Sequence, residues 1–398
     1  MQYLKEDYLM QIVFVFVIGV GVTLLFTPVS IKLAHRFGIM DIPKDDRRMH
    51  VRAMPRFGGL GIFVGSMAAL IMPASQNTQI MYAMIGGLLM YILGTIDDIF
   101  DLKPLVKFAG QTAIAIMMYA VGIRITFISD FFGSATANEN ANLVLSNSLA
   151  FIITVLWIVG VTNAVNLMDG LDGLAAGTTA IMMMSLAYIA YIHGDRYGRM
   201  TVCVALVAIA ASCIGFLPYN FSPAKTFMGD GGALYLGYMI AVLSVISPLK
   251  KATLVAAIVP IMTLAIPIFD TLFAIVRRSL NHEPIMKADH GHLHHHLMAA
   301  GFGQRRSVLI IYGIVGIMGM VAVLLSRELY KDAFFLATIA ALYLSIILVR
   351  KQPKKKSYAK LRKMARRRKQ KRLKRNANVN GSQRQDKDYK EETAEQES

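Results

Sequence analysis

The feature that most constrains this sequence is a series of long apolar blocks with almost no charged residues. Each block holds roughly 17 to 25 residues, which is enough for a helix to cross a hydrocarbon core of about 30 Å. The 398-residue chain is 55% hydrophobic and 17% charged, whereas a typical soluble domain has about 25% charged residues. These properties exclude a soluble enzyme, a disordered chain and an outer-membrane barrel. We therefore predict an all-α, polytopic membrane helix bundle.

The apolar blocks predict about eleven membrane spans in a domain that covers residues 1–349. They lie at about 9–31, 57–74, 79–96, 105–123, 149–167, 172–193, 200–217, 232–247, 252–276, 307–325 and 333–349. Residues 124–148 carry a short alternating segment and then a turn rich in Gly, Ser and Asn, which predicts a short external β-hairpin.

Basic residues predict how the chain is oriented in the membrane. The loops at 32–56, 97–107, 218–231 and 277–306 hold 15 of the 23 Lys and Arg residues before residue 350, which places them in the cytoplasm and the N-terminus outside. The tail at 350–398 has 19 basic and 6 acidic residues, and it accounts for 13 of the 17 net positive charges. We expect this tail to be cytoplasmic, largely disordered and in contact with anionic lipids. Tyr358 is the only aromatic residue in its basic part (350–375), so we expect no nucleic-acid binding.

The first polar cluster closes the third predicted span with Asp97, Asp98 and Asp101. On a continuous helix, Asp97 and Asp101 would lie one turn apart on one face, with Asp98 beside them. Closely spaced carboxylates repel, which raises one proton affinity or attracts a divalent cation. The alternative is a solvated helix end, although acids at a helix C-terminus oppose the macrodipole.

The second cluster lies between the fifth and sixth predicted spans. Its members recur every three residues, so that a helix would present them as one polar stripe: Asn163, Asn166, Asp169 and Asp172. Gly170 and Gly173 would allow a tight turn or the close approach of another backbone. The alternative is a hydrogen-bonded seam between helices, which explains the asparagine and the glycines but not two acids.

The third cluster is the segment Met228-Gly229-Asp230-Gly231-Gly232 at the start of the eighth predicted span. Glycines that lead into a helix offer free backbone amides to a phosphate group. Asp230 would then be a metal ligand beside a phosphate site, and the alternative role is that of an N-cap.

The fourth cluster places five histidines within seven residues of the loop between the ninth and tenth predicted spans. Its candidate ligands of an anionic substrate are His292, His294, His295 and His296, together with flanking arginines such as Arg305. The alternatives are a zinc-binding tract and solvated histidines. The loop before Gly58-Gly59 carries seven Lys or Arg residues, which the orientation rule explains for the most part, and a contribution to phosphate binding stays open.

All four clusters fall on the predicted cytoplasmic side, which indicates phosphoryl transfer with a membrane-embedded reactant. Together they resemble the polyprenyl-phosphate N-acetylhexosamine-1-phosphate transferases over about residues 9–350. The motifs that carry the resemblance are Asp97-Asp98, Asn163-x-x-Asn166-x-x-Asp169-Gly-x-Asp172-Gly-Leu-Ala, Met228-Gly229-Asp230 and His292-Leu-His294-His295-His296. The segment Pro55-Arg56-Phe57-Gly58-Gly59 and the eleven spans look more like the N-acetylglucosamine-1-phosphate branch than the phospho-N-acetylmuramoyl-pentapeptide branch.

The resemblance implies a bacterial plasma-membrane enzyme that moves a sugar 1-phosphate from a UDP-N-acetylhexosamine to undecaprenyl phosphate, with Mg²⁺ or Mn²⁺ as cofactor. Asp230 and Asp98 would bind the metal, and Asp97 and Asp169 would complete the catalytic set. The predicted substrate-binding residues are Asn163, Asn166, Asp172, Lys103, Lys107, Arg305 and the four histidines. Lys103 is a weaker candidate, because Asp101 stands where the peptidoglycan branch often has a lysine. A homodimer is compatible with the sequence.

Three rival functions fail on the positions of particular residues. An ion-coupled transporter needs acids near the middle of the bilayer, whereas these acids lie at one face. An intramembrane aspartyl protease needs Gly-x-Gly-Asp, and position 227 is Phe. A CDP-alcohol phosphotransferase needs an Arg five residues after Asp172, where Gly177 stands.

Overall fold

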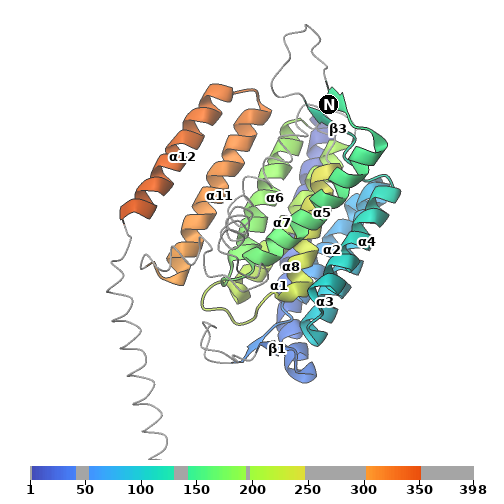
Figure 1. Ribbon diagram of the computed structural model, residues 1–398, viewed down its shortest axis with the longest axis vertical. Helices are drawn as coiled ribbons and strands as arrows, with labels where there is room; N and C mark the ends of the chain where they lie inside the picture. Colours follow the sequence, from blue (N-terminus) through green and yellow to red (C-terminus); the bar gives the residue numbers. More distant parts are fainter. Residues whose placement is uncertain (1, 42–52, 130–141, 194–197, 247–301, 351–398) are drawn as a thin grey trace, which may run out of the picture. The chain divides into compact units, whose positions relative to one another are not determined.

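The computed structural model describes residues 2–41, 53–129, 142–193, 198–246 and 302–350. Its helices are α1 (Gln2–Phe37), α2 (Gly59–Gln76), α3 (Thr78–Phe100), α4 (Pro104–Ala120), α5 (Asn147–Met168), α6 (Leu174–Ile192), α7 (Arg199–Asn220), α8 (Gly229–Ile246), α11 (Gln304–Ser326) and α12 (Tyr330–Arg350) (Figure 1). Each of them coincides with a predicted span. The predicted span at 252–276, the histidine cluster and the basic tail lie outside the described residues.

The helices confirm a polytopic all-α membrane protein. Eight of the described helices are long and apolar enough to cross a membrane, and α4, with 17 residues, is slightly shorter than these eight. The predicted external hairpin is also confirmed, because β3 (Phe127–Ser129) pairs antiparallel with β4 (Asn142–Val144). A second pair, β1 (Met40–Asp41) with β2 (Met54–Pro55), was not predicted, because two residues on each side are too few for an alternating pattern.

Helices α7 and α8 form the interior of the bundle. In each of these two helices, 89% of the 18-residue apolar segment that could span a membrane is buried within the protein. Helix α7 packs against α1, α2 and α6, whereas α8 packs mainly against α3 and α5. The largest fully buried side chains include Tyr235 and Tyr238 of α8 and Phe216 of α7. Helix α11 lies along α6 (Figure 1).

Two helix ends differ from the expected course. Helix α3 ends at Phe100, and Asp101 takes a left-handed conformation with φ 52° and an exposed side chain. The prediction that Asp97 and Asp101 share a helix face is therefore wrong. Pro104, which begins α4, explains the break, because a proline disfavours helical conformation in the residue before it and cannot continue a helix.

Helix α5 ends at Met168, so Asp169 and Asp172 lie in the turn that follows it. The predicted four-residue helical stripe is thus wrong beyond Asn166. The turn depends on Gly173, whose φ of +81° is readily available only to glycine.

Glycines allow α3 and α8 to approach closely at the end of the bundle where α8 begins. A Cβ atom added at Gly94 of α3 would lie 2.4 Å from the backbone oxygen of Asp230. A Cβ added at Gly59 of α2 would lie 2.6 Å from the Cα atom of Gly232. Backbone atoms of α8 therefore contact both neighbouring helices directly at its first turn.

This close approach predicts the effect of Gly94→Ala. Because the added methyl group meets backbone rather than a flexible side chain, we expect a loss of about 1–3 kcal/mol of stability. The thermal unfolding midpoint in detergent should fall. Gly160→Ala in α5 is the matched control, since an added Cβ meets nothing within 4 Å there. Equal unfolding midpoints for the two variants would contradict the predicted contact.

Candidate active site

Side chains from five parts of the chain meet where α8 begins. They are Arg56 before α2, Asp97 and Asp98 of α3, Lys107 of α4, Asn166 of α5 and Asp230 of α8. We call these six residues the charged centre. Its members lie near the last turns of α3 and α5 and the first turns of α4 and α8, so it occupies one end of the bundle.

Asp98 binds the N-terminus of α8. One carboxylate oxygen accepts the amide of Asp230 at 2.9 Å, and the other accepts the amide of Gly231 at 3.0 Å. The Asp98 side chain is only 2% exposed. A carboxylate at this place both satisfies free helix amides and opposes the positive end of the helix dipole. These two amides are therefore not free for a phosphate, contrary to the expectation from the glycine-rich segment.

Arg56 forms ion pairs with both Asp98 and Asp230. Its Nε atom lies 3.0 Å from the carboxylate of Asp98, and its Nη2 atom lies 3.1 Å from that of Asp230. The two carboxylates raise the pKa of Arg56 further above its usual value, although burial opposes this shift. A planar guanidinium with several donors can bridge two carboxylates in this way, whereas a lysine ammonium acts as a single point charge.

Backbone pairing positions Arg56. The carbonyl of Pro55 accepts the amide of Phe227 at 2.8 Å, and the amides of Gly58 and Gly59 donate to the carbonyls of Phe227 and Met228. The segment before α2 therefore runs beside the segment before α8. The sequence analysis left the role of this basic loop open and did not single out Arg56. The available signal was its place directly after Pro55 and two residues before the Gly58-Gly59 pair.

Lys107 contacts the carboxylates of Asp97 and Asp230. Its Nζ atom lies 2.7 Å from Asp97 Oδ2 and 3.4 Å from Asp230 Oδ2. On the other side, Asn166 Nδ2 donates to Asp230 Oδ1 at 2.7 Å. Asp230 therefore receives a cation and an amide from two different helices, and its side chain keeps 21% exposure. Together with Arg56, whose side chain is 36% exposed, Asp230 offers a place at which a ligand can reach the charged centre.

The charged centre holds three carboxylates and two cationic side chains, which leaves one net negative charge. Asp97 and Asp230 share Lys107, so their oxygens lie close enough to offer two ligands to a hard cation such as Mg²⁺. In the described ranges, no group of three or more His, Cys, Asp and Glu residues is arranged to hold a metal ion. A cation bound here would need ligands from water or substrate, as Mg²⁺ commonly has.

The turn after α5 is tied to the loop after α7. Asn220 Oδ1 accepts the amide of Gly173 at 3.0 Å, and Asp172 Oδ2 accepts the amide of Ala224 at 3.1 Å. Asn220 is 2% exposed and also donates to the carbonyl of Thr226. Burial, and then the charge of Asp230, raise the pKa of Asp169 in this turn well above its usual range. The sequence analysis missed Asn220, whose only signal was a polar residue at the end of an apolar helix.

Three further predicted site residues, Asn163, Lys103 and Arg305, do not join the charged centre. Asn163 points its amide at Gln111 of α4, as described below. Lys103 is exposed before α4 and has no ion pair with an acid among the described residues. Arg305 donates to the carbonyl of Ser222 in the loop after α7. The four predicted histidines, His292, His294, His295 and His296, lie outside the described residues.

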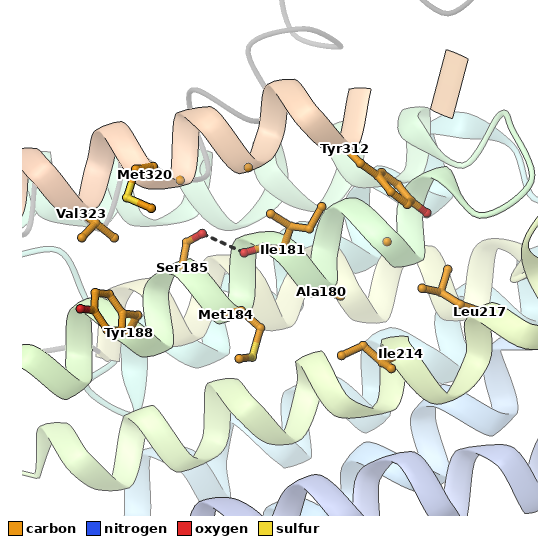
Figure 2. Close-up of a pocket in the computed structure, with 13 residues that line it drawn as sticks. Ala180, Ile181, Met184, Ser185, Tyr188, Ile214, Leu217, Tyr312, Met320 and Val323 are labelled. Carbon is orange, nitrogen blue, oxygen red and sulfur yellow. Dashed lines mark hydrogen bonds between the residues drawn. The ribbon is translucent and has the colours of Figure 1, made fainter. Parts of the chain in front are cut away.

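A separate apolar pocket of about 510 Å³ lies between α6, α7 and α11 (Figure 2). None of the predicted site residues lines it. Tyr312 connects this pocket to the turn after α5, because its hydroxyl donates a hydrogen bond to the carbonyl of Gly173. The lining residues are Gly177, Ala180, Ile181, Met184, Ser185, Tyr188, Ile214, Leu217, Tyr312, Gly316, Gly319, Met320 and Val323.

The capping contact predicts the effect of substitutions at Asp98. Asp98→Ala leaves two buried helix amides without an acceptor, which costs about 1–3 kcal/mol. Asp98→Asn keeps one acceptor oxygen and should lose less. Thermal unfolding in detergent measures both variants. Asn77→Ala, which removes an ordinary side-chain cap from α3, is the reference; a loss at Asp98 no greater than that at Asn77 would argue against the contact.

Comparison with the sequences of known proteins places this chain in a family. The model of glycosyl transferase family 4 matches residues 80–248. A probable undecaprenyl-phosphate N-acetylglucosaminyl 1-phosphate transferase of Bacillus subtilis is 39% identical over 343 residues, which cover 86% of this chain and 92% of that protein.

Two further relatives are more distant. A decaprenyl-phosphate N-acetylglucosaminephosphotransferase of Mycobacterium tuberculosis is 34% identical over 312 residues, covering 72% of this chain and 75% of that protein. A phospho-N-acetylmuramoyl-pentapeptide-transferase of Desulforudis audaxviator is 30% identical over 332 residues, covering 75% and 95%. With its membrane-spanning helices and its charged centre at one end of the bundle, this chain belongs to glycosyl transferase family 4.

Proposed function

We propose that this protein transfers N-acetylglucosamine 1-phosphate from UDP-N-acetylglucosamine to undecaprenyl phosphate and releases UMP. The reaction would be the first membrane step in the synthesis of a cell-envelope glycopolymer such as wall teichoic acid. The observation that carries the proposal is the arrangement of Asp97, Lys107 and Asp230, where one ammonium joins a buried and a partly buried carboxylate at the end of the membrane helices. The likeness to the Bacillus subtilis transferase supports the choice of sugar and lipid.

The charged centre suits the chemistry of two anionic reactants. An oxygen of the lipid phosphate would attack the phosphorus that bears the sugar, and the bond from that phosphorus to the UMP oxygen would break. Lys107 and Arg56, which both contact Oδ2 of Asp230, supply fixed positive charge beside it. The lipid phosphate is largely ionised near pH 7, so little proton transfer is required. We infer that positioning and neutralisation of charge account for most of the catalysis.

We also propose a divalent cation at this centre, held by Asp230 and Asp97. The net negative charge and the two close carboxylates support it. Such a cation, when bound, neutralises and orients phosphate oxygens. Both oxygens of Asp98 already accept backbone amides, and one of them also faces Arg56. Asp97 accepts the backbone amide of Leu102 with one oxygen, while its other oxygen contacts Lys107, which also contacts Asp230; we therefore favour Asp97 as the second ligand over Asp98, which the sequence analysis favoured.

We propose that the charged centre faces the cytoplasm. The end of the bundle that holds it also carries Lys103, Lys107 and Lys225, and the sequence between β1 and β2 contains four more basic residues. The positive-inside rule assigns such an end to the cytoplasm. Cysteine labelling from either side of intact cells, at single cysteines placed at Lys225 and Asn147, tests the orientation.

The proposed reaction is tested with purified protein, undecaprenyl phosphate and radiolabelled UDP-N-acetylglucosamine. We expect lipid-soluble label and release of UMP in the same amount, and no product when divalent cations are chelated. UDP-N-acetylmuramoyl-pentapeptide serves as the competing donor, since a relative of 30% identity is named phospho-N-acetylmuramoyl-pentapeptide-transferase. Transfer from this donor alone would replace the proposed substrate. No product from either donor would refute the proposed reaction.

Asp230→Ala should reduce turnover by roughly a hundredfold to a thousandfold or more, because it removes the group on which Arg56, Lys107 and Asn166 converge. It should also abolish the binding of Mn²⁺, which electron paramagnetic resonance measures. Asp332→Asn, an exposed acid in the first turn of α12, is the control. Activity of Asp230→Ala close to that of the control would remove Asp230 from the mechanism.

A further inference from the structure

A pair of amide side chains joins α4 to α5 one helical turn away from the charged centre. Gln111 of α4 is fully buried. Its oxygen accepts Asn163 Nδ2 at 2.5 Å, and its Nε2 atom donates to Asn163 Oδ1 at 3.4 Å. Asn163 Nδ2 also donates to the carbonyl of Val159 in its own helix at 2.8 Å. The two amides thus satisfy each other within the protein and are not directed at Asp230.

Each member of this pair stands one turn from a residue of the charged centre. Lys107 precedes Gln111 by four residues on α4, and Asn166 follows Asn163 by three residues on α5, so each lies next along the same helix face. Lys107 and Asn166 contact the two different oxygens of the Asp230 carboxylate. The spacing of these two contacts therefore depends on how α4 sits against α5.

The beginning of α4 is held against α3, where Lys107 pairs with Asp97 and Gly110 lies against Leu93. Leu105, Val106 and Phe108 are 77%, 52% and 53% exposed, so the first turns of this helix bury few apolar side chains. Gln111 is the first fully buried residue along α4, and Ile114 and Ala115 follow it. Among the described residues, the contact between Gln111 and Asn163 is the side-chain hydrogen bond between α4 and α5 that lies nearest to Lys107.

We propose that Gln111 is a positioning residue which, through Asn163, holds Lys107 and Asn166 in register on the Asp230 carboxylate. The inference rests on the proposed sugar-phosphate transfer and deepens it. It also assigns Asn163 to the support of the site, in place of the substrate contact expected from the sequence. A reciprocal amide pair suits this task, because each amide donates and accepts and so resists sliding of one helix along the other.

The experiment measures kcat and the KM of both substrates for Gln111→Leu, Gln111→Asn and the exchanged pair Gln111→Asn with Asn163→Gln. Small misplacement of catalytic groups lowers the rate of the chemical step more than it weakens substrate binding. We expect kcat to fall about tenfold to a hundredfold in both single variants, with KM values within about threefold. The exchanged pair should recover most of the loss, because it restores one long and one short amide.

Thr112→Val in the same helix is the matched control, since the Thr112 hydroxyl bonds only to the carbonyl of Phe108 in its own helix. Its kcat should equal that of the wild-type protein. The thermal unfolding midpoint of every variant is measured alongside, and Gln111→Asn keeps the test open if Gln111→Leu does not fold.

Unchanged kcat in Gln111→Asn would refute the inference. So would an exchanged pair that recovers unfolding temperature but not kcat, because the amide contact would then serve stability alone. Absence of turnover in the wild-type protein with either donor would instead refute the proposed function, and the two failures are therefore distinguishable.

Discussion

The buried carboxylate of Asp98 is the contact on which the polar end of this protein depends. It binds the first two free amides of α8 and pairs with Arg56, so α3, α8 and the segment before α2 meet at one side chain. A negative charge at a helix N-terminus is favoured by both hydrogen bonding and the helix dipole. The same turn of α8 carries Asp230, whose carboxylate contacts Arg56, Lys107 and Asn166. The position of the Asp230 carboxylate thus follows from the contacts of Asp98.

The charged centre combines groups that are costly to bury singly and acceptable together. A lone carboxylate among membrane helices would be expensive, and here each acid has a cation or a set of amide donors within hydrogen-bond distance. The three carboxylates and two cationic side chains leave one net negative charge. It lies where a divalent cation and two phosphates would meet under the proposed function. Partial exposure of Asp230 and Arg56 gives these ligands access, while Asp98 and Gln111 remain enclosed and hold the frame.

The sequence patterns predicted elements well and their ends poorly. Hydropathy located every described helix to within several residues, and the alternation near residue 127 predicted the hairpin. The extrapolation of a three-residue spacing beyond Asn166 failed, because Gly170 and Gly173 end the helix before the acids are reached. The expected face shared by Asp97 and Asp101 failed for a similar reason at Pro104. A periodic pattern says which face a residue would occupy only while the helix continues.

The sequence alone determined that this chain crosses a membrane many times and that its acids and amides gather at the helix ends on one side, because both properties depend on local composition. Only the tertiary structure decided which of these groups meet. It selected Arg56 from a loop with seven basic residues, gave the α8 amides to Asp98, and turned Asn163 toward Gln111. The contact of Asp98 with the α8 amides depends on the close packing of α3 and α8 at Gly94, between residues more than 130 positions apart. Contacts at such separation are set by how whole helices pack, which no local pattern of residues records.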